Sequence, residues 1–287
     1  MRFKNSIYFT LNRFIIASII GLIIGSALDL QISHLLYLKG NIIPNFIRFT
    51  GEMPMILLAG SFSFEIIKRY LQDKINKTYP LVEIKTLIFV LAIIAFLLPI
   101  FISSKGIPTY FKDSNSLLHL YIFIFYILGS VLLSLLYKDI DNKSLMKYFL
   151  FLFIIVLLTM IIMNLMKNIW TRQRYFPMRE INNYKNFSFW LIPQFRLEIT
   201  DAVKSFPSGH TTSATVMLAL LFFPKVKDKR VKKYLSYFAI FWTIFVALGR
   251  ILDGAHFLTD VSFAILMTIL IIKLADNTVK THLEHRL

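Results

Sequence analysis

Long apolar runs dominate this chain, and they decide which solvent it folds in. Of its 287 residues, 56% are hydrophobic and the mean hydropathy is +0.64. Soluble domains are nearer about 45–50% apolar even when glycine is counted. In a bilayer the backbone must satisfy its own hydrogen bonds, and apolar runs of this length do so as helices. The sequence therefore predicts an all-α integral membrane protein.

We expect about eight transmembrane helices, at residues 14–28, 53–67, 86–103, 117–137, 148–166, 211–224, 234–251 and 257–275. Some of these runs are shorter than the roughly 20 residues of a perpendicular span, so a re-entrant segment is an alternative. Residues 30–52 mix apolar and polar side chains and predict a segment on the outer surface. The first run could also be a signal peptide cleaved near Gly25-Ser26-Ala27; a retained helix is favoured because similar runs follow it.

The charge distribution supports this topology. The chain has 32 Lys and Arg against 16 Asp and Glu, a formal net charge of +16. These basic residues are spread between the apolar runs, which disfavours nucleic acid as a partner. With both termini inside, most of them fall in inner segments. The outer exceptions concentrate in residues 167–209 and at Arg250. Cysteine is absent, which excludes disulfides, thiolate metal sites and a cysteine nucleophile.

Three polar clusters occupy the outer ends of predicted spans, at residues 167–175, 207–210 and 249–260. Alternating topology brings the ends of the fifth and seventh spans and the starts of the sixth and eighth to one face, so the clusters can meet. The second cluster, Pro-Ser-Gly-His, begins a helix, where backbone N–H groups without partners bind anions. An ordinary N-cap beside a histidine is the plainer interpretation of this cluster alone.

The charged residues of these clusters suit a phosphate group. Lys167, Arg174 and Arg250 can complement the phosphate oxygens, and arginine adds a planar fork of donors. Each of them could instead be an interfacial anchor at a span end. Their occurrence together with two histidines favours phosphoryl transfer without a metal.

The histidines suggest how the transfer would proceed. His256 and Asp260 are four residues apart, on one face of a helix. The carboxylate can hold one imidazole N–H and leave the other nitrogen to attack phosphorus. His210 can then exchange protons with the leaving oxygen and with water. Two alternatives are a helix-stabilising pair and a His–His–Asp zinc site, although the nearby cations would repel the metal.

These motifs resemble the type 2 phosphatidic acid phosphatase family, the membrane branch of a superfamily that includes soluble acid phosphatases and vanadium haloperoxidases. The family pattern is Lys-x6-Arg-Pro, then Pro-Ser-Gly-His, then Ser-Arg-x5-His-x3-Asp, and it corresponds here to Lys167 and Arg174, to residues 207–210, and to Arg250, His256 and Asp260. Tyr175 replaces the proline and Gly249 the serine, which we interpret as lost rigidity or a lost secondary contact. The resemblance covers mainly residues 148–275.

The resemblance implies a role for each matching residue. His256 would be the nucleophile, Asp260 its orienting partner and His210 the general acid and then base. Phosphate would be held by Lys167, Arg174, Ser208, Gly209 and Arg250. The family needs no metal or cofactor. Its membrane members act on phosphatidate, phosphatidylglycerol phosphate, polyprenyl diphosphate or lipid A. Arg172 lies off the motif spacing, so we expect it to matter less than Arg174.

The sequence thus predicts N-terminal helices with an outer surface segment over residues 1–147, catalytic helices over 148–275 around a six-helix core, and an inner tail over 276–287. The expected activity is dephosphorylation of a membrane lipid at the outer face of a bacterial plasma membrane, with that lipid as the partner. A lipid phosphotransferase is the alternative. An anion transporter fits less well, because such sites lie near the bilayer midplane.

Overall fold

The computed structural model describes residues 2–75, 86–97, 116–223 and 229–283. Throughout these ranges the regular elements are helices, and none of the described residues forms a strand. The all-α prediction is therefore confirmed for this part of the chain. The chain divides into two compact units, one of Met1–Glu52, Ile154–Phe222 and Lys232–Asn277, the other of Met53–Phe153, Phe223–Val231 and Thr278–Leu287.

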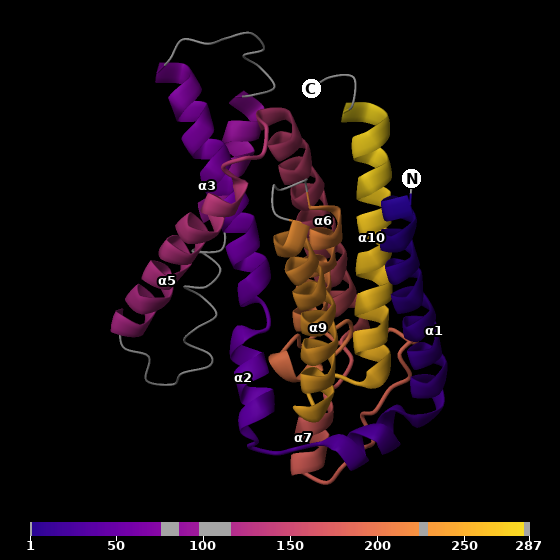
Figure 1. Cartoon of the computed structure of the whole chain (residues 1–287). Coiled ribbons are helices and arrows are strands. Elements are labelled where there is room, and N and C mark those ends of the chain that lie inside the picture. Colours follow the sequence, from indigo (N-terminus) through magenta and orange to yellow (C-terminus); the bar gives the residue numbers. More distant parts are fainter. Residues whose placement is uncertain (1, 76–85, 98–115, 224–228, 284–287) are drawn as a thin grey trace. The chain divides into compact units, whose positions relative to one another are not determined.

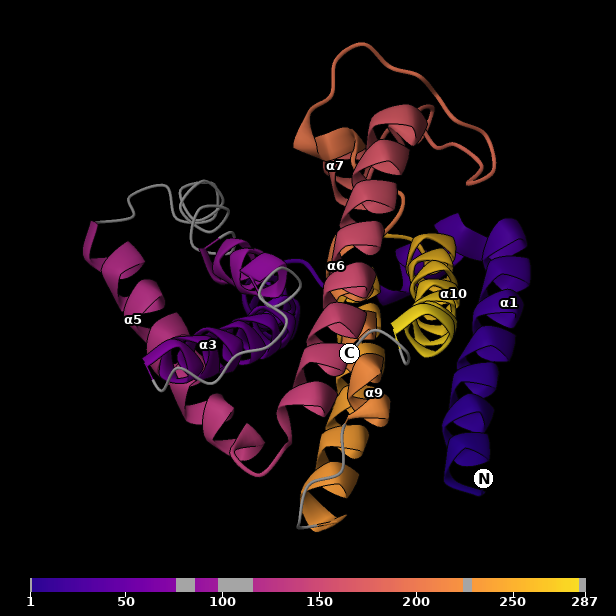
Figure 2. The ribbon, with the colours of Figure 1, turned by 90° about the horizontal axis from the view of Figure 1, so that it is seen from above.

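Long helices build the first unit. They are α1 (Arg2–Leu36), most of α6 (Asn142–Trp170), α9 (Lys229–Leu252) and α10 (Leu258–Leu283). Figures 1 and 2 show α1 alongside α10. At their lower ends in Figure 1, α9 and α10 share a small core of Ala247, Ile251 and Val261, against which Ile32 and Leu36 of α1 pack. This packing ties the N-terminal helix to the two helices that carry the third polar cluster.

A short helix forms the interior of this unit. It consists of α8 (Gly209–Val216) and the 3-10 turn η3 (Met217–Phe222), and most of its residues are buried. Thr243 of α9 donates a hydrogen bond to the Ala214 carbonyl at 3.2 Å. A helix that is buried on nearly all sides belongs to a protein core. The sixth predicted span is thus a short central helix.

Four helices in the described part of the chain are long and apolar enough to cross a membrane: Ser6–Leu36, Asn142–Glu180, Arg230–Leu252 and Leu258–Val279. They correspond to the first, fifth, seventh and eighth predicted spans. Shorter apolar helices lie at Thr86–Leu97, Tyr121–Tyr137 and Gly209–Phe222, and residues 98–103 of the third predicted span lie outside the described residues. The apolar helices indicate a membrane protein, while the count of eight and the six-helix core stay predictions.

The predicted surface segment consists of the last turns of α1 and a second short helix, α2 (Ile42–Thr50). The side chain of Asn41 caps α2 by accepting a hydrogen bond from the Ile43 N–H at 2.9 Å. Pro44 and Ile47 are buried, whereas Ile42 and Phe46 on the other face are exposed. One face of α2 is therefore buried within the first unit, while the other face exposes apolar side chains.

The second unit contains α3 (Met53–Ile75), a helix at 86–97, α5 (Ser116–Ser134) and the 3-10 turn η1 (Leu135–Tyr137). The ring of Phe62 stacks on Tyr137 at 4.1 Å, and the Tyr137 hydroxyl is 2.6 Å from Ser61 Oγ. Arg69 pairs with the buried Glu65 at 2.8 Å and donates to the Tyr137 carbonyl at 2.7 Å. These polar contacts hold α3 against the end of α5.

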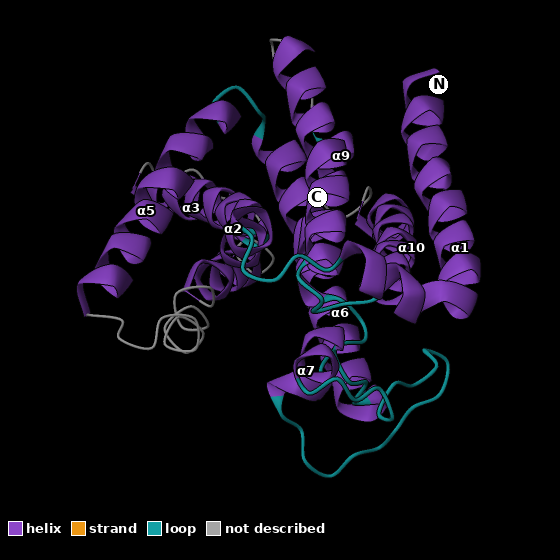
Figure 3. Ribbon diagram, turned by 90° about the horizontal axis from the view of Figure 1, so that it is seen from below, coloured by secondary structure: helices purple, strands orange, loops and turns teal. Residues whose placement is uncertain are grey.

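The long polar segment between α6 and α8 is mostly irregular, as Figure 3 shows. It contains α7 (Tyr175–Glu180) and the 3-10 turn η2 (Asp201–Val203). Its two ends are joined by backbone hydrogen bonds, from Arg174 N to Ala202 O at 2.8 Å and from Ser205 N to Arg172 O at 3.0 Å. The residues that leave α6 and those that enter α8 are therefore neighbours.

Gly249 is required by the packing of α2 on α9. A Cβ atom at this position would overlap the side chain of Ile47, and overpacking of this kind costs about 1–3 kcal/mol. We expect Gly249→Ser to lower the midpoint of thermal unfolding, followed by circular dichroism in detergent. Ile47→Ala should relieve the overlap, so the double variant should be more stable than the sum of the two single effects predicts. Strict additivity would contradict this packing.

Candidate active site

The three polar clusters meet at one end of the helices of the first unit, near α7 in Figure 1. The Ser205 N–H donates to the Arg172 carbonyl at 3.0 Å and links the first cluster to the approach to α8. The Ser208 N–H donates to the Asp260 carbonyl at 3.3 Å and links the second cluster to the third. The structure thus places the predicted site residues in one region.

Lys167 and Gly209 are adjacent at this site. Lys167 lies in the last turn of α6, and Gly209 is the first residue of α8. A Cβ on Gly209 would come within 3.1 Å of Lys167 Nζ. Glycine at this position therefore leaves space for the ammonium group next to the start of α8. The first backbone N–H groups of a helix have no intrahelical acceptor and can bind anions. The ammonium group of Lys167 therefore lies next to N–H groups that suit an anion.

The two arginines of the site hold carboxylates. Arg174 forms a two-pronged pair with Asp201, at 2.7 and 3.0 Å, and Asp201 is 77% exposed. Arg250 Nη1 lies 2.9 Å from Asp253 Oδ2. Burial raises the pKa of the Asp253 carboxyl, and the charge of Arg250 opposes this shift. Both predicted phosphate-binding arginines are therefore paired with a carboxylate of the protein itself.

His256 is held by a backbone carbonyl. Its side chain is buried, and Nδ1 lies 2.5 Å from the Ser205 carbonyl oxygen. Because a carbonyl only accepts, Nδ1 must donate, and Nε2 keeps its lone pair. The Asp260 carboxylate, which we expected to hold this N–H, is 3.9 Å from Nδ1. That distance is beyond a hydrogen bond, so Ser205 fixes the tautomer.

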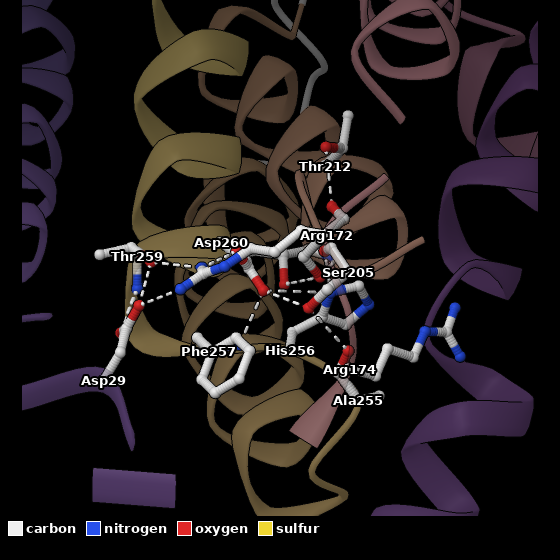
Figure 4. Close-up of polar contacts among 12 residues, drawn as sticks. Asp29, Arg172, Arg174, Ser205, Thr212, Ala255, His256, Phe257, Thr259 and Asp260 are labelled. Atoms are coloured by element: carbon white, nitrogen blue, oxygen red, sulfur yellow. Dashed lines mark hydrogen bonds and ion pairs between the residues drawn. The ribbon is translucent and has the colours of Figure 1, made fainter. Parts of the chain in front are cut away.

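Asp260 instead fixes the residues around His256. Its Oδ2 accepts hydrogen bonds from Ser205 Oγ at 2.5 Å and from the Phe257 N–H at 2.8 Å. Its Oδ1 receives Arg172 Nη1 at 2.5 Å. Figure 4 shows Asp260 between Arg172 on one side and His256 on the other. The carboxylate therefore orients the nucleophile candidate through Ser205.

Arg172, which lies off the motif spacing, is buried beside the candidate site. Its side chain is 1% exposed, and its guanidinium lies 4.3 Å from the Phe257 ring. It also pairs with Asp29 of α1 at 2.9 Å. Sequence reasoning missed Asp29, although an ionisable residue next to an apolar run is a signal of a buried functional contact.

His210 faces α2. Its Nε2 is 2.9 Å from the Arg48 carbonyl, and its Nδ1 is 3.6 Å from the Glu52 carboxylate. Arg48 lies in the last turn of α2 and Glu52 follows the helix, so neither residue was expected at the site. Both lie far from His210 in the sequence, and no spacing pattern connects them to it.

Ser208 acts as a helix cap. Its buried hydroxyl accepts from the Thr211 N–H at 3.4 Å and lies 2.8 Å from Thr211 Oγ1. The side chain of Ser208 is thus an ordinary N-cap, which was the plainer interpretation of the Pro-Ser-Gly-His cluster. The backbone N–H groups of Gly209 and His210 lie in the first turn of α8, where an anion could accept from them.

The two departures from the family pattern both contact N-terminal helices. The Tyr175 hydroxyl is 2.9 Å from Nδ1 of His34 in α1, and the Tyr175 ring is fully buried. Gly249 leaves the space that Ile47 of α2 fills. Tyr175 therefore forms a contact with α1, and Gly249 allows a contact with α2, in place of the rigidity or secondary contact that we expected to be lost.

Positive charge surrounds both histidines. Burial lowers the pKa of His256 well below its ordinary value of 6.5, and Arg250, Arg174 and Lys167 lower it further. Burial also lowers the pKa of His210 to about 4; Glu52 opposes this shift, while Arg250 and Lys167 add to it. Arg250 and Lys167 thus act on both imidazoles, which are neutral near pH 7. Among the described residues no group of His, Cys, Asp or Glu is arranged to hold a metal ion.

These features define a membrane protein with a buried histidine beside a set of cations that suits an oxyanion. Residues 148–283 match the family model of the PAP2 superfamily, and they form a PAP2 superfamily domain. This confirms the resemblance that the three motifs indicate, and it supports phosphatase or phosphotransfer chemistry in general. Searches of curated proteins and of solved structures gave no match.

The low pKa values of the histidines predict a loss of stability in acid. Below about pH 6.5 the unfolded chain binds protons that the folded protein does not take up until lower pH, so folding becomes less favourable. We expect the unfolding temperature in detergent to be highest above pH 6.5 and to fall as the pH is lowered to 5. His210→Gln keeps a donor for the Arg48 carbonyl and removes one titrating group, so its fall should be shallower. Equal slopes in both proteins would contradict the assignment to His210.

Proposed function

We propose that this protein is a metal-independent phosphatase that removes phosphate from a membrane lipid phosphate or diphosphate through a phosphohistidine. The observation that carries this proposal is the hydrogen bond between His256 Nδ1 and the Ser205 carbonyl. It leaves Nε2 with a lone pair, and burial together with the nearby cations lowers the pKa of this imidazole, which keeps it neutral and nucleophilic. The superfamily domain supports the general chemistry.

In the proposed first step, the Nε2 lone pair of His256 attacks phosphorus. The bond between phosphorus and the lipid oxygen breaks, and that oxygen takes a proton from His210 and leaves as an alcohol or a lipid monophosphate. In the second step, water attacks the phosphohistidine while His210 accepts the water proton. The bond between phosphorus and Nε2 breaks, and inorganic phosphate leaves with His256 restored.

The cations would stabilise the charge on phosphorus oxygens in both steps. Lys167 and the N–H groups of Gly209 and His210 lie together at the start of α8. Arg174 and Arg250, now paired with Asp201 and Asp253, would turn their guanidinium donors to the phosphate.

His210 needs a proton for the first step. With a pKa of about 4 it is neutral near pH 7 in the phosphate-free protein. A phosphate dianion beside the ring favours the charged imidazolium, and Glu52 at 3.6 Å acts in the same direction. Substrate binding would therefore supply the charge that lets His210 act as an acid.

The surroundings of the site favour a lipid substrate. The segment between α7 and η2 exposes large apolar side chains, namely Phe189, Leu191, Ile192, Phe195, Leu197 and Ile199. Exposed apolar side chains on an irregular segment suit a membrane interface, where acyl chains can contact them. We place the site at the outer face of a bacterial plasma membrane because the distribution of basic residues favours that orientation.

His256→Ala should abolish phosphate release, because it removes the attacking nitrogen. The assay is phosphate release by purified protein in detergent micelles from phosphatidate, phosphatidylglycerol phosphate, polyprenyl diphosphate or lipid A. A protein labelled with radioactive lipid phosphate and quenched in base should carry an acid-labile label, and His256→Ala should not. Substantial turnover in His256→Ala would contradict the mechanism. Transfer of phosphate to an added alcohol in place of water would identify a phosphotransferase.

Excess chelator should leave this activity unchanged, since the proposed steps use only protein side chains, water and the lipid. The measurement compares initial rates before and after dialysis against EDTA, with and without added Mg²⁺ or Zn²⁺. A strict requirement for either ion would exclude the metal-independent mechanism.

A further inference from the structure

A carboxylate of the first helix is buried beside the candidate active site. Asp29 lies on α1, is 3% exposed and falls outside residues 148–283 of the family match. An ionised side chain is costly to bury unless it is paired and hydrogen-bonded. The proposed steps do not use Asp29, so its burial needs another explanation.

Asp29 binds two elements that are distant in the sequence. Its Oδ1 accepts a hydrogen bond from the Thr259 N–H at 3.0 Å, and its Oδ2 receives Arg172 Nη2 at 2.9 Å. The Thr259 hydroxyl also donates to Oδ2. Both carboxylate oxygens are therefore satisfied, one by the start of α10 and the other jointly by α10 and the segment after α6.

Two glycines let α1 approach α10 closely enough for these contacts. A Cβ on Gly25 would lie 2.7 Å from Asp29 Oδ1 and 2.7 Å from Thr259 Cγ2, and a Cβ on Gly21 would overlap the Ser262 side chain. Glycines four residues apart are the usual device for close helix contact in membranes. The two helices run side by side in Figures 1 and 2. The backbone of α1 thus brings Asp29 to the first turn of α10.

Arg172 connects Asp29 to the nucleophile candidate. While Nη2 binds Asp29, Nη1 binds Asp260 Oδ1 at 2.5 Å. Asp260 accepts from Ser205 Oγ at 2.5 Å, and the Ser205 carbonyl holds His256 Nδ1 at 2.5 Å. Figure 4 shows these side chains in a row from Asp29 to His256. The row is buried along its length, so each group has few alternative partners.

We propose that Asp29 is a positioning residue of the active centre, and that α1 thereby contributes a residue to a centre whose proposed catalytic groups lie within the family domain. Asp29 acts through Arg172, because it fixes one amino group of the guanidinium and so presents the other to Asp260. Asp260 then keeps Ser205 and His256 in place. This inference rests on the proposed function, and Asp29 itself does not touch the substrate.

Asp29→Asn tests this role with little change of shape. Asparagine keeps an acceptor for the Thr259 N–H but sets an amide NH2 against the Arg172 donors. We expect kcat for phosphate release to fall about tenfold or more, as for the loss of a hydrogen bond to a charged group. KM should change by less than about twofold, because the phosphate-binding cations are untouched. Asp29→Glu, which restores the charge, should retain more activity than Asp29→Asn.

Asp276→Asn is the matched control. Asp276 of α10 is buried and accepts a hydrogen bond from Tyr8 of α1 at 2.5 Å, so it joins the same two helices away from the site. Its variant should lose stability without losing kcat. Equal losses of kcat in Asp29→Asn and Asp276→Asn would show a general packing effect and overturn the inference.

A double variant tests the route through Arg172. Arg172→Met removes the connecting group, so adding Asp29→Asn to Arg172→Met should cause no further loss of kcat. Fully additive losses would mean that Asp29 acts independently of Arg172 and would overturn the proposed route.

A measurement without turnover separates this inference from the proposed function. Nitrogen-15 NMR of histidine-labelled protein reports the tautomer of His256, whose signals are assigned by their loss in His256→Ala. The protein should show His256 protonated at Nδ1, and Asp29→Asn should show a mixture of tautomers. Absence of phosphate release from the unmodified protein would refute the proposed function, whereas an unchanged His256 tautomer in Asp29→Asn would refute the role of Asp29.

Discussion

The pairing of one buried guanidinium with two buried carboxylates is the interaction on which the candidate site depends. Arg172 lies between Asp29 and Asp260, and all three side chains are nearly inaccessible to solvent. Such a group is costly to desolvate, and it is stable only if the remaining lone pairs are satisfied. Thr259 and Ser205 provide those hydrogen bonds. Three separate parts of the chain therefore meet at Arg172. Asp260 and Ser205 connect this contact to His256.

The two sides of Asp260 differ in their electrostatic environment. On one side of Asp260 the charges of Arg172 and Asp29 are mutually compensated. On the other side, burial lowers the pKa values of His256 and His210, and the charges of Arg250 and Lys167 lower both further. Because a neutral imidazole is a nucleophile and a protonated one is not, in the proposed mechanism these cations would both bind an oxyanion and keep His256 able to attack.

Residues 1–52 form one compact unit with most of the PAP2 superfamily domain, although the family match begins at residue 148. Both departures from the family pattern are explained by this arrangement. Tyr175 bonds to His34, and the missing side chain of Gly249 makes room for Ile47. The residues at positions 175 and 249 of the domain thus match the N-terminal helices that pack against them.

The sequence by itself indicated that the chain folds in a membrane, that it is helical and that three polar clusters can meet. Apolar length and charge spacing are local properties, so they can be recognised without the tertiary structure. The spacing within one cluster also indicated His256 and Arg250 as candidate site residues. Only the tertiary structure decided which group holds which: the carbonyl of Ser205 binds His256, the carbonyl of Arg48 binds His210, and Asp29 reaches Arg172. Partners contributed by a backbone carbonyl, or by a helix more than a hundred residues away, leave no periodic pattern in the chain; they exist only once the helices pack.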